Sequence, residues 1–219
     1  MNSQIKIDKS NGKLLKIALI LSFVTIIYNL LEGGISVFFG LSDAALSLLG
    51  FGIDSFVEVL SGLGIAHMIL RMQKNEVNTW DAFERFALKV TGISFYILTA
   101  GLILGSVLNI IQGVKPETTI PGIIVSIISI ISMYILLKYK LRIGNELNSE
   151  AIIADANCTR TCFNLSIILL ASSLLYTIFK INYIDILGSL GIAYYAFKEG
   201  KESLEKSKSS SINCSCDDD

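Results

Sequence analysis

Polar and charged residues are too scarce in this sequence to cover a soluble globule. Charged residues make up 17% of the 219 residues, hydrophobic residues make up 52%, and the mean hydropathy is +0.62. Such a composition leaves too little polar surface to face water on every side. It therefore indicates a protein that lies in a membrane. The net charge of -1 also argues against nucleic acid as a partner.

Several other features are missing. The four cysteines, Cys158, Cys162, Cys214 and Cys216, match neither a secreted disulfide framework nor a zinc-finger array. The polar first 16 residues lack the early apolar run of a removable signal peptide, so we expect the first helix to stay in the membrane. No GxxxxGK[ST] motif for ATP occurs. These absences argue against a disulfide-stabilised domain and against an ATP-driven enzyme.

Long apolar runs dominate the rest of the chain. Six can be distinguished, at residues 14–39, 44–70, 86–111, 120–137, 152–179 and 184–197. Since about 20 apolar residues in a helix cross the hydrocarbon layer, the runs predict an all-α integral membrane protein. We expect six transmembrane helices within residues 14–199 and a cytoplasmic segment at residues 1–13. Residues 200–219 are expected to form a flexible, Cys- and Asp-containing cytoplasmic tail.

Basic residues are distributed unevenly between the two sides of such a bundle. One side would carry 15 of the 18 Lys and Arg residues, Lys140 among them, whereas the other side would carry Lys115 and Lys180. The remaining one, Arg160, falls inside the fifth run. Because cytoplasmic loops are enriched in Lys and Arg, we expect both termini to be cytoplasmic. The expected location is therefore a membrane that the chain crosses several times.

Two acidic residues of the second run stand one helical turn apart. Asp54 and Glu58, in the segment GFGIDSFVEVLSG, occupy positions i and i+4 and share a helix face. A charged side chain at mid-membrane costs about 2.5 kcal/mol or more unless it is paired, hydrated or bound. Two carboxylates side by side also repel, so we expect a cation between them or a proton on one of them. The pair is a candidate metal site.

The fifth run offers a matching set of donors. In SEAIIADANCTRTCFNLS, three residues stand at i, i+3 and i+7 and share a face, namely Asp155, Cys158 and Cys162. Glu58 and Asp155 each lie 13 residues from the nearest cytoplasmic Arg, and Asp54 and Cys158 lie 17 and 16 residues from it. The two faces therefore reach the same depth. Carboxylates and thiolates at one depth are a donor set for tetrahedral zinc or cadmium.

Other interpretations stay open. A cysteine in a membrane helix is commonly a small apolar packing residue, and an acidic residue can line a water-filled cavity. Depth counting allows a buried pair between Glu32 and Arg160, and it places His67 in an interfacial, solvated role. Cys214 and Cys216, followed by three aspartates, could capture metal on the cytoplasmic side or belong to a disordered tail.

These segments resemble the cation diffusion facilitator (cation efflux) superfamily, most closely a short bacterial branch that lacks the C-terminal cytoplasmic domain. The likeness covers nearly the whole chain, through NLLEGGISVFFG, SLLGFGIDSFVEVLSG, SEAIIADANCTRTC and YIDILGSLGIAYYAFKEGKES. The family's ligand pair on the second helix matches Asp54 and Glu58, and its pair on the fifth helix falls on Cys158 and Cys162. The resemblance implies a cation-efflux-like bundle in a bacterial plasma membrane, a homodimer, and exchange of metal against protons.

Both fifth-helix positions are Cys here, whereas the better-known members have His and Asp. Sulfur favours zinc, cadmium and softer ions such as mercury or copper(I) over manganese or iron. We expect a secondary transporter that exports divalent heavy-metal cations, binds no cofactor and catalyses no reaction. Its expected metal ligands are Asp54, Glu58, Asp155, Cys158 and Cys162. The alternative is a non-transporting metal sensor or dithiol redox protein, although cysteines one helical turn apart have poor disulfide geometry.

Overall fold

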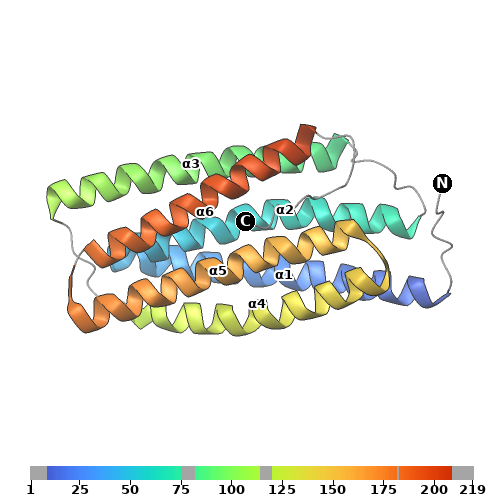
Figure 1. Ribbon diagram of the computed structural model, residues 1–219, viewed down its shortest axis with the longest axis horizontal. Coiled ribbons are helices and arrows are strands. Elements are labelled where there is room, and N and C mark those ends of the chain that lie inside the picture. The colour runs from blue at the N-terminus through green and yellow to red at the C-terminus, as the bar shows by residue number, and fades with distance from the viewer. Residues whose placement is uncertain (1–8, 75–81, 114–119, 182, 209–219) are drawn as a thin grey trace.

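The computed structural model describes residues 9–74, 82–113, 120–181 and 183–208. These residues form six α-helices: α1 (Lys9–Ser42), α2 (Leu46–Gln73), α3 (Ala82–Gln112), α4 (Ile120–Glu146), α5 (Glu150–Phe179) and α6 (Tyr183–Lys208). No strand occurs among the described residues. Figure 1 shows that all the helices run along the long axis of one bundle. The predicted all-α fold is therefore confirmed.

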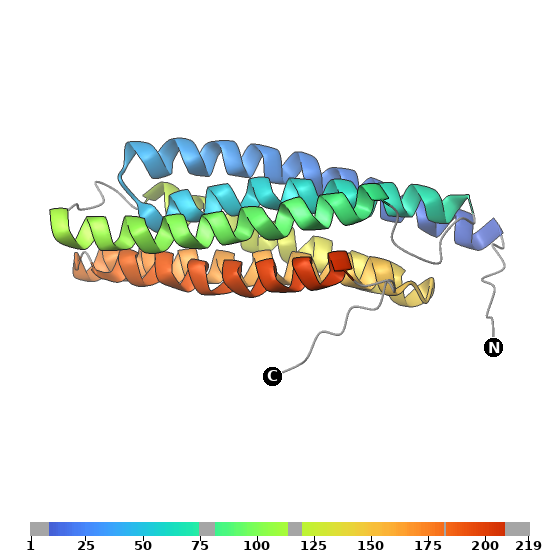
Figure 2. The same ribbon diagram turned by 90° about the horizontal axis from the view of Figure 1, so that it is seen from above.

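Five helices are long and apolar enough to cross a membrane. Their candidate spans within the described residues are Gly12–Ser42, Leu46–Gln73, Ala82–Gln112, Ile120–Glu146 and Asp155–Phe179. Helix α6 is of similar length but has a charged second half, FKEGKESLEKSK. It nevertheless runs beside α3 in both Figure 1 and Figure 2. The chain is thus a multi-pass membrane protein.

Helix α6 continues past the point where the sequence predicted its end. Residues 200–208, assigned above to a flexible tail, are helical. Glu202 and Lys206 form an ion pair one turn apart, which stabilises this part of the helix. Leu204 also packs on α3, so closely that a Cβ at Gly92 would lie 2.7 Å from its Cγ. The predicted boundary is corrected because charge pairing and packing extend a helix beyond its apolar run.

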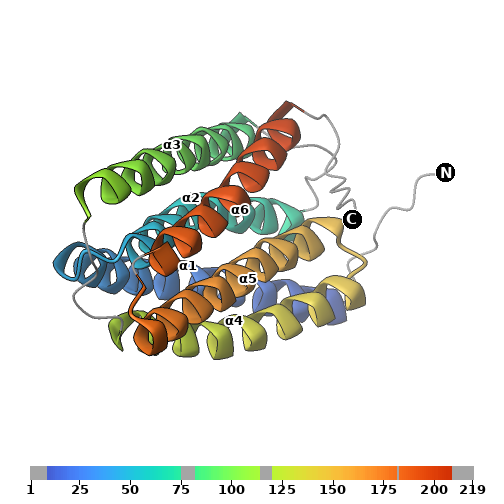
Figure 3. The same ribbon diagram turned by 60° about the vertical axis from the view of Figure 1, so that its left-hand side comes forward.

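Helix α2 occupies the centre of the bundle, since it packs against α1, α3, α5 and α6. Helices α1 and α2, and likewise α4 and α5, are neighbours in sequence and pack side by side, whereas α3 and α6 pair from distant parts of the chain. Figure 3 shows α3 at the top of the bundle and α4 and α5 at the bottom, with α6 crossing in front of α2. A side chain on α2 can therefore meet several other helices.

A residue of α6 caps the first turn of α2. The backbone N–H of Leu46 donates to Oδ2 of Asp185 over 2.9 Å, and that of Ser47 donates to Oδ1 over 3.3 Å. The Ser47 hydroxyl also contacts Oδ1. Ala45, at the N-cap, has no side-chain acceptor for these N–H groups, so Asp185 supplies it. The cap ties the helix that carries Asp54 and Glu58 to α6.

A glycine brings α1 close to α2. A Cβ at Gly52 would lie 2.7 Å from the backbone nitrogen of Val37, so a larger residue would force the helices apart. This close approach of small residues is typical of helix packing in membranes. It allows short polar side chains of α1 to reach those of α2.

Candidate metal-ion site

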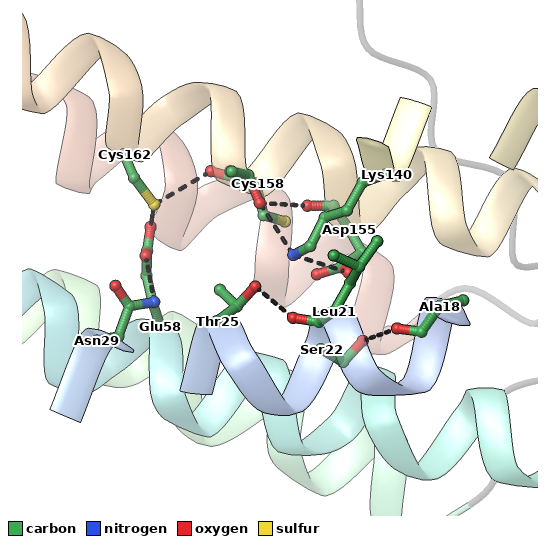
Figure 4. A network of polar contacts seen from close by, with 11 residues as sticks. Ala18, Leu21, Ser22, Thr25, Asn29, Glu58, Lys140, Asp155, Cys158 and Cys162 are labelled. Carbon is green, nitrogen blue, oxygen red and sulfur yellow. Dashed lines mark hydrogen bonds and ion pairs between the residues drawn. The ribbon is translucent and has the colours of Figure 1, made fainter. Parts of the chain in front are cut away.

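Two of the predicted ligands are in contact across the bundle. The Cys162 thiol of α5 donates to Oε1 of Glu58 on α2 (Figure 4). Cys162 is 3% exposed. Its Sγ also lies 3.5 Å from the carbonyl oxygen of Cys158. The two faces therefore meet, but Glu58 contacts Cys162, whereas the depth count placed Glu58 level with Asp155.

A third helix reaches the same carboxylate. Nδ2 of Asn29, on α1, donates to Oε2 of Glu58 over 3.1 Å (Figure 4). The two oxygens of Glu58 thus face different groups, the thiol of Cys162 and the amide of Asn29. Asn29 is 1% exposed, and its Oδ1 has no hydrogen-bond partner. A buried polar atom without a partner costs about 1–3 kcal/mol, so this oxygen needs an explanation.

Asp54 lies one helical turn from Glu58 and is also buried, with 2% of its surface exposed. Its Oδ1 has no hydrogen-bond partner. An acidic oxygen in this state is costly inside an apolar bundle. The predicted acidic pair is therefore present, and one of its members carries an unused acceptor.

Asp155 is engaged elsewhere. Its Oδ2 lies 2.9 Å from Nζ of Lys140 on α4, and the side chains are 9% and 2% exposed. Lys140 also donates to Oγ1 of Thr159 over 3.0 Å. The sequence placed Lys140 among the basic residues of the cytoplasmic flank, but its side chain turns into the bundle (Figure 4). The carboxylate of Asp155 is thereby neutralised within the protein.

Cys158 is half-buried, and both described cysteines are free thiols. Glu199 of α6 is an acidic residue that was not among the predicted ligands. It accepts a hydrogen bond of 2.8 Å from Thr161, which lies in the same turn of α5 as Cys158 and Cys162. Glu199 was not predicted as a site residue because it follows the last apolar run, where acidic residues usually face solvent. Cys214 and Cys216 lie outside the described residues.

Glu32 has hydrogen-bond partners of its own within the bundle. Its Oε1 accepts a hydrogen bond of 2.7 Å from Tyr28, and its Oε2 accepts one of 3.3 Å from Ser55. Arg160 is exposed. The hydrogen bonds of Glu32 are therefore made with hydroxyl groups, and the buried Glu32–Arg160 pair that depth counting allowed does not form. His67 has a side chain 38% exposed and lies 3.3 Å from the buried Glu84, in keeping with a position outside the candidate site.

The five predicted ligands are therefore only partly assembled. Glu58 and Cys162 touch, Asp54 and Cys158 each lie one turn from one of them, and Asp155 pairs with a lysine. In the described part of the chain, no three His, Cys, Asp or Glu side chains are close enough to hold one ion. Asn29 touches Glu58 but was not predicted, because the prediction considered only ionisable groups and cysteines. The signal in the sequence that could have identified Asn29 is its amide side chain within an apolar run, three residues before Glu32.

The sequence model of the cation efflux transmembrane domain matches residues 17–210. This chain belongs to the cation efflux family. An uncharacterized transporter of Methanocaldococcus jannaschii is 28% identical over 174 residues, which make up 78% of this chain and 61% of that relative. The chain thus spans about three fifths of the relative's length.

Membership of the cation efflux family confirms the resemblance noted in the sequence. This is a family of transporters and not of enzymes, and the part of it that matches here is the transmembrane domain. The match includes all of α2 and α5, the helices on which the candidate ligands lie.

Proposed function

We propose that this cation efflux protein is a secondary transporter that exports divalent heavy-metal ions, zinc or cadmium foremost, in exchange for protons. It would act as a homodimer in a bacterial plasma membrane, with both termini cytoplasmic. The observation that carries the proposal is the contact between the Cys162 thiol and the Glu58 carboxylate. It joins a soft and a hard donor on two membrane helices.

The chemistry of this contact suits exchange of an ion for a proton. In the empty protein the thiol hydrogen lies between sulfur and oxygen. A divalent ion that binds there takes the place of this hydrogen, forms bonds to the thiolate sulfur and the carboxylate oxygen, and releases one proton. A proton that returns to sulfur breaks the metal–sulfur bond and frees the ion. Metal binding by thiols and proton release are coupled in this way generally.

The remaining donors would complete the coordination. Asp54 supports this role through its unpartnered Oδ1, one turn from Glu58. Cys158 stands one turn from Cys162 on α5. Asp155 would contribute only after it parted from Lys140, because its Oδ2 is now occupied. Two carboxylates and two thiolates are a donor set suited to zinc and cadmium. Helix rocking would then expose the site to either side of the membrane in turn.

Transport in liposomes tests the proposal. Purified protein is reconstituted with a metal-sensitive dye inside, and zinc, cadmium, cobalt, manganese and iron are supplied with and without a pH gradient. We expect zinc and cadmium to move fastest and the pH gradient to drive them. Asp54→Asn and Glu58→Gln should abolish transport, because each removes an anionic oxygen and keeps the side-chain size.

Glu146→Gln is the matched control, since the Glu146 side chain is 43% exposed at the end of α4. It should transport like the wild type. Wild-type rates in Glu58→Gln at equal protein level would eliminate the proposed site. Metal binding without any transport would favour the sensor alternative.

A further inference from the structure

Asn29 is the neutral side chain that touches the candidate site. It is almost fully buried on α1, and its Nδ2 lies 3.1 Å from Oε2 of Glu58. Its Oδ1, on the other end of the same amide, is buried and has no hydrogen-bond partner. In Figure 4 this amide lies beside Glu58, on the side away from Cys162.

An amide has a donor end and an acceptor end, and only the donor end is used here. With no ion present, the donor end suits Glu58, because a carboxylate can only accept hydrogen bonds. A cation on Glu58 would reverse this preference, since it repels N–H groups and attracts oxygen. Rotation of the amide plane by about 180° would exchange the two ends without moving the helix. The orphaned oxygen would then have a partner.

We propose that Asn29 is a further ligand of the transported ion, whose Oδ1 coordinates the ion that Glu58 and Cys162 bind. This inference rests on the function proposed above. In the empty protein Asn29 positions the Glu58 carboxylate, and in the loaded protein it supplies a neutral oxygen. A neutral ligand adds affinity without adding a further proton to the exchange.

The oxygen donor also affects which ions are bound. Oxygen donors favour harder ions, and sulfur donors favour softer ones. Zinc is the harder of the two preferred ions, so it should depend on Asn29 more than cadmium does. The two cysteines should have the opposite effect. Asn29 would thereby set the balance between zinc and cadmium from a third helix.

The test compares zinc and cadmium transport in liposomes for Asn29→Leu, Asn29→Asp, Glu58→Gln and the wild type. Ser22→Ala is the control, because Ser22 is equally buried on α1 and donates only to the Ala18 carbonyl, over 3.2 Å. Asn29→Leu keeps the size and removes the oxygen. It should raise the half-saturating zinc concentration by about tenfold or more, with a smaller change for cadmium. Asn29→Asp restores an oxygen and should recover zinc transport.

Two results would overturn the proposal while the proposed site survives. One is normal zinc affinity in Asn29→Leu beside an inactive Glu58→Gln. The other is an equal loss of zinc and cadmium transport in both Asn29 variants, which indicates a packing role. If Asn29→Leu does not fold, the ratio of the two metals in Asn29→Asp decides alone, and an equal loss overturns the proposal. Normal transport in Glu58→Gln would overturn the proposed function and this inference together.

Discussion

Lys140 of α4 and Asp155 of α5 form an ion pair, with 2.9 Å between Nζ and Oδ2, in which neither side chain is more than 9% exposed. A buried charge pair gains little stability overall, because both groups lose their hydration. Loss of one partner, however, leaves the other charge buried alone. The pair therefore holds α4 against α5 in a way that depends on both residues.

Lys140→Met should lower the free energy of unfolding by about 3–5 kcal/mol, because it leaves the Asp155 carboxylate without its partner. The double variant Lys140→Met with Asp155→Asn should be more stable than this single variant. Unfolding of purified protein in detergent measures both. Lys201→Met is the control, since Lys201 is 66% exposed and pairs with Glu205 at 4.0 Å. Equal stability of the single and double variants would show that the pair is not coupled.

The same double variant tests the proposed ligand role of Asp155. If Asp155 binds the transported ion after leaving Lys140, the double variant should fold and yet bind zinc more weakly than the wild type. If Asp155 only balances the lysine charge, zinc affinity should be near the wild-type value. Zinc titration of the folded double variant separates these outcomes.

The fold could be predicted from the sequence because each helix contains a long apolar run. Helix ends were less predictable. The sixth apolar run stops at Phe197, but α6 continues to Lys208 through charge pairs and contacts with α3 that no apolar run records. Helix length is thus decided in part by interactions that form only after the helices pack.

The candidate site was predictable only in part. Spacing placed the candidate donors on one face of α2 and one face of α5, because it depends on helix geometry alone. The count of depth placed Glu58 level with Asp155, whereas Glu58 contacts Cys162, seven residues further along α5. The partners of Asp155 and Glu58 depend on how α4 and α1 are rotated about their axes. A single sequence does not specify that rotation, so Lys140 and Asn29 were not assigned to these residues.

Metal selectivity should depend on the two cysteines. Cys158→His with Cys162→Asp exchanges two soft donors for a borderline nitrogen and a hard oxygen, so cadmium transport should fall more than zinc transport. The ratio of initial cadmium and zinc rates in liposomes measures this. Because Cys162 contacts Glu58, Cys162→Ser alone should change the ratio more than Cys158→Ser. An unchanged ratio of cadmium to zinc rates in a well-folded double variant would rule out ligation by these sulfurs.

Charge bias predicts which end of the bundle faces outward. In a variant without the four native cysteines, Ile181→Cys beside Lys180 should react with a membrane-impermeant thiol reagent in intact cells. Lys208→Cys should react only after the cells are opened. The reverse pattern would invert the predicted orientation. Lys115, the other predicted outward basic residue, lies outside the described residues.

Zinc affinity should rise with pH, because binding is proposed to displace the hydrogen between Cys162 and Glu58. At a pH where the empty protein keeps its thiol, each proton released makes the half-saturating concentration fall by about tenfold per pH unit. Cys162→Ala removes this hydrogen, so the pH dependence should become shallower by about one proton per ion. Zinc titrations at several pH values measure the slope, and proton release in weak buffer provides a second measurement. The Ser22→Ala variant should keep the wild-type slope, because the Ser22 hydroxyl that it removes donates to a backbone carbonyl and not to the site. An unchanged slope in Cys162→Ala would show that the exchanged proton comes from another group.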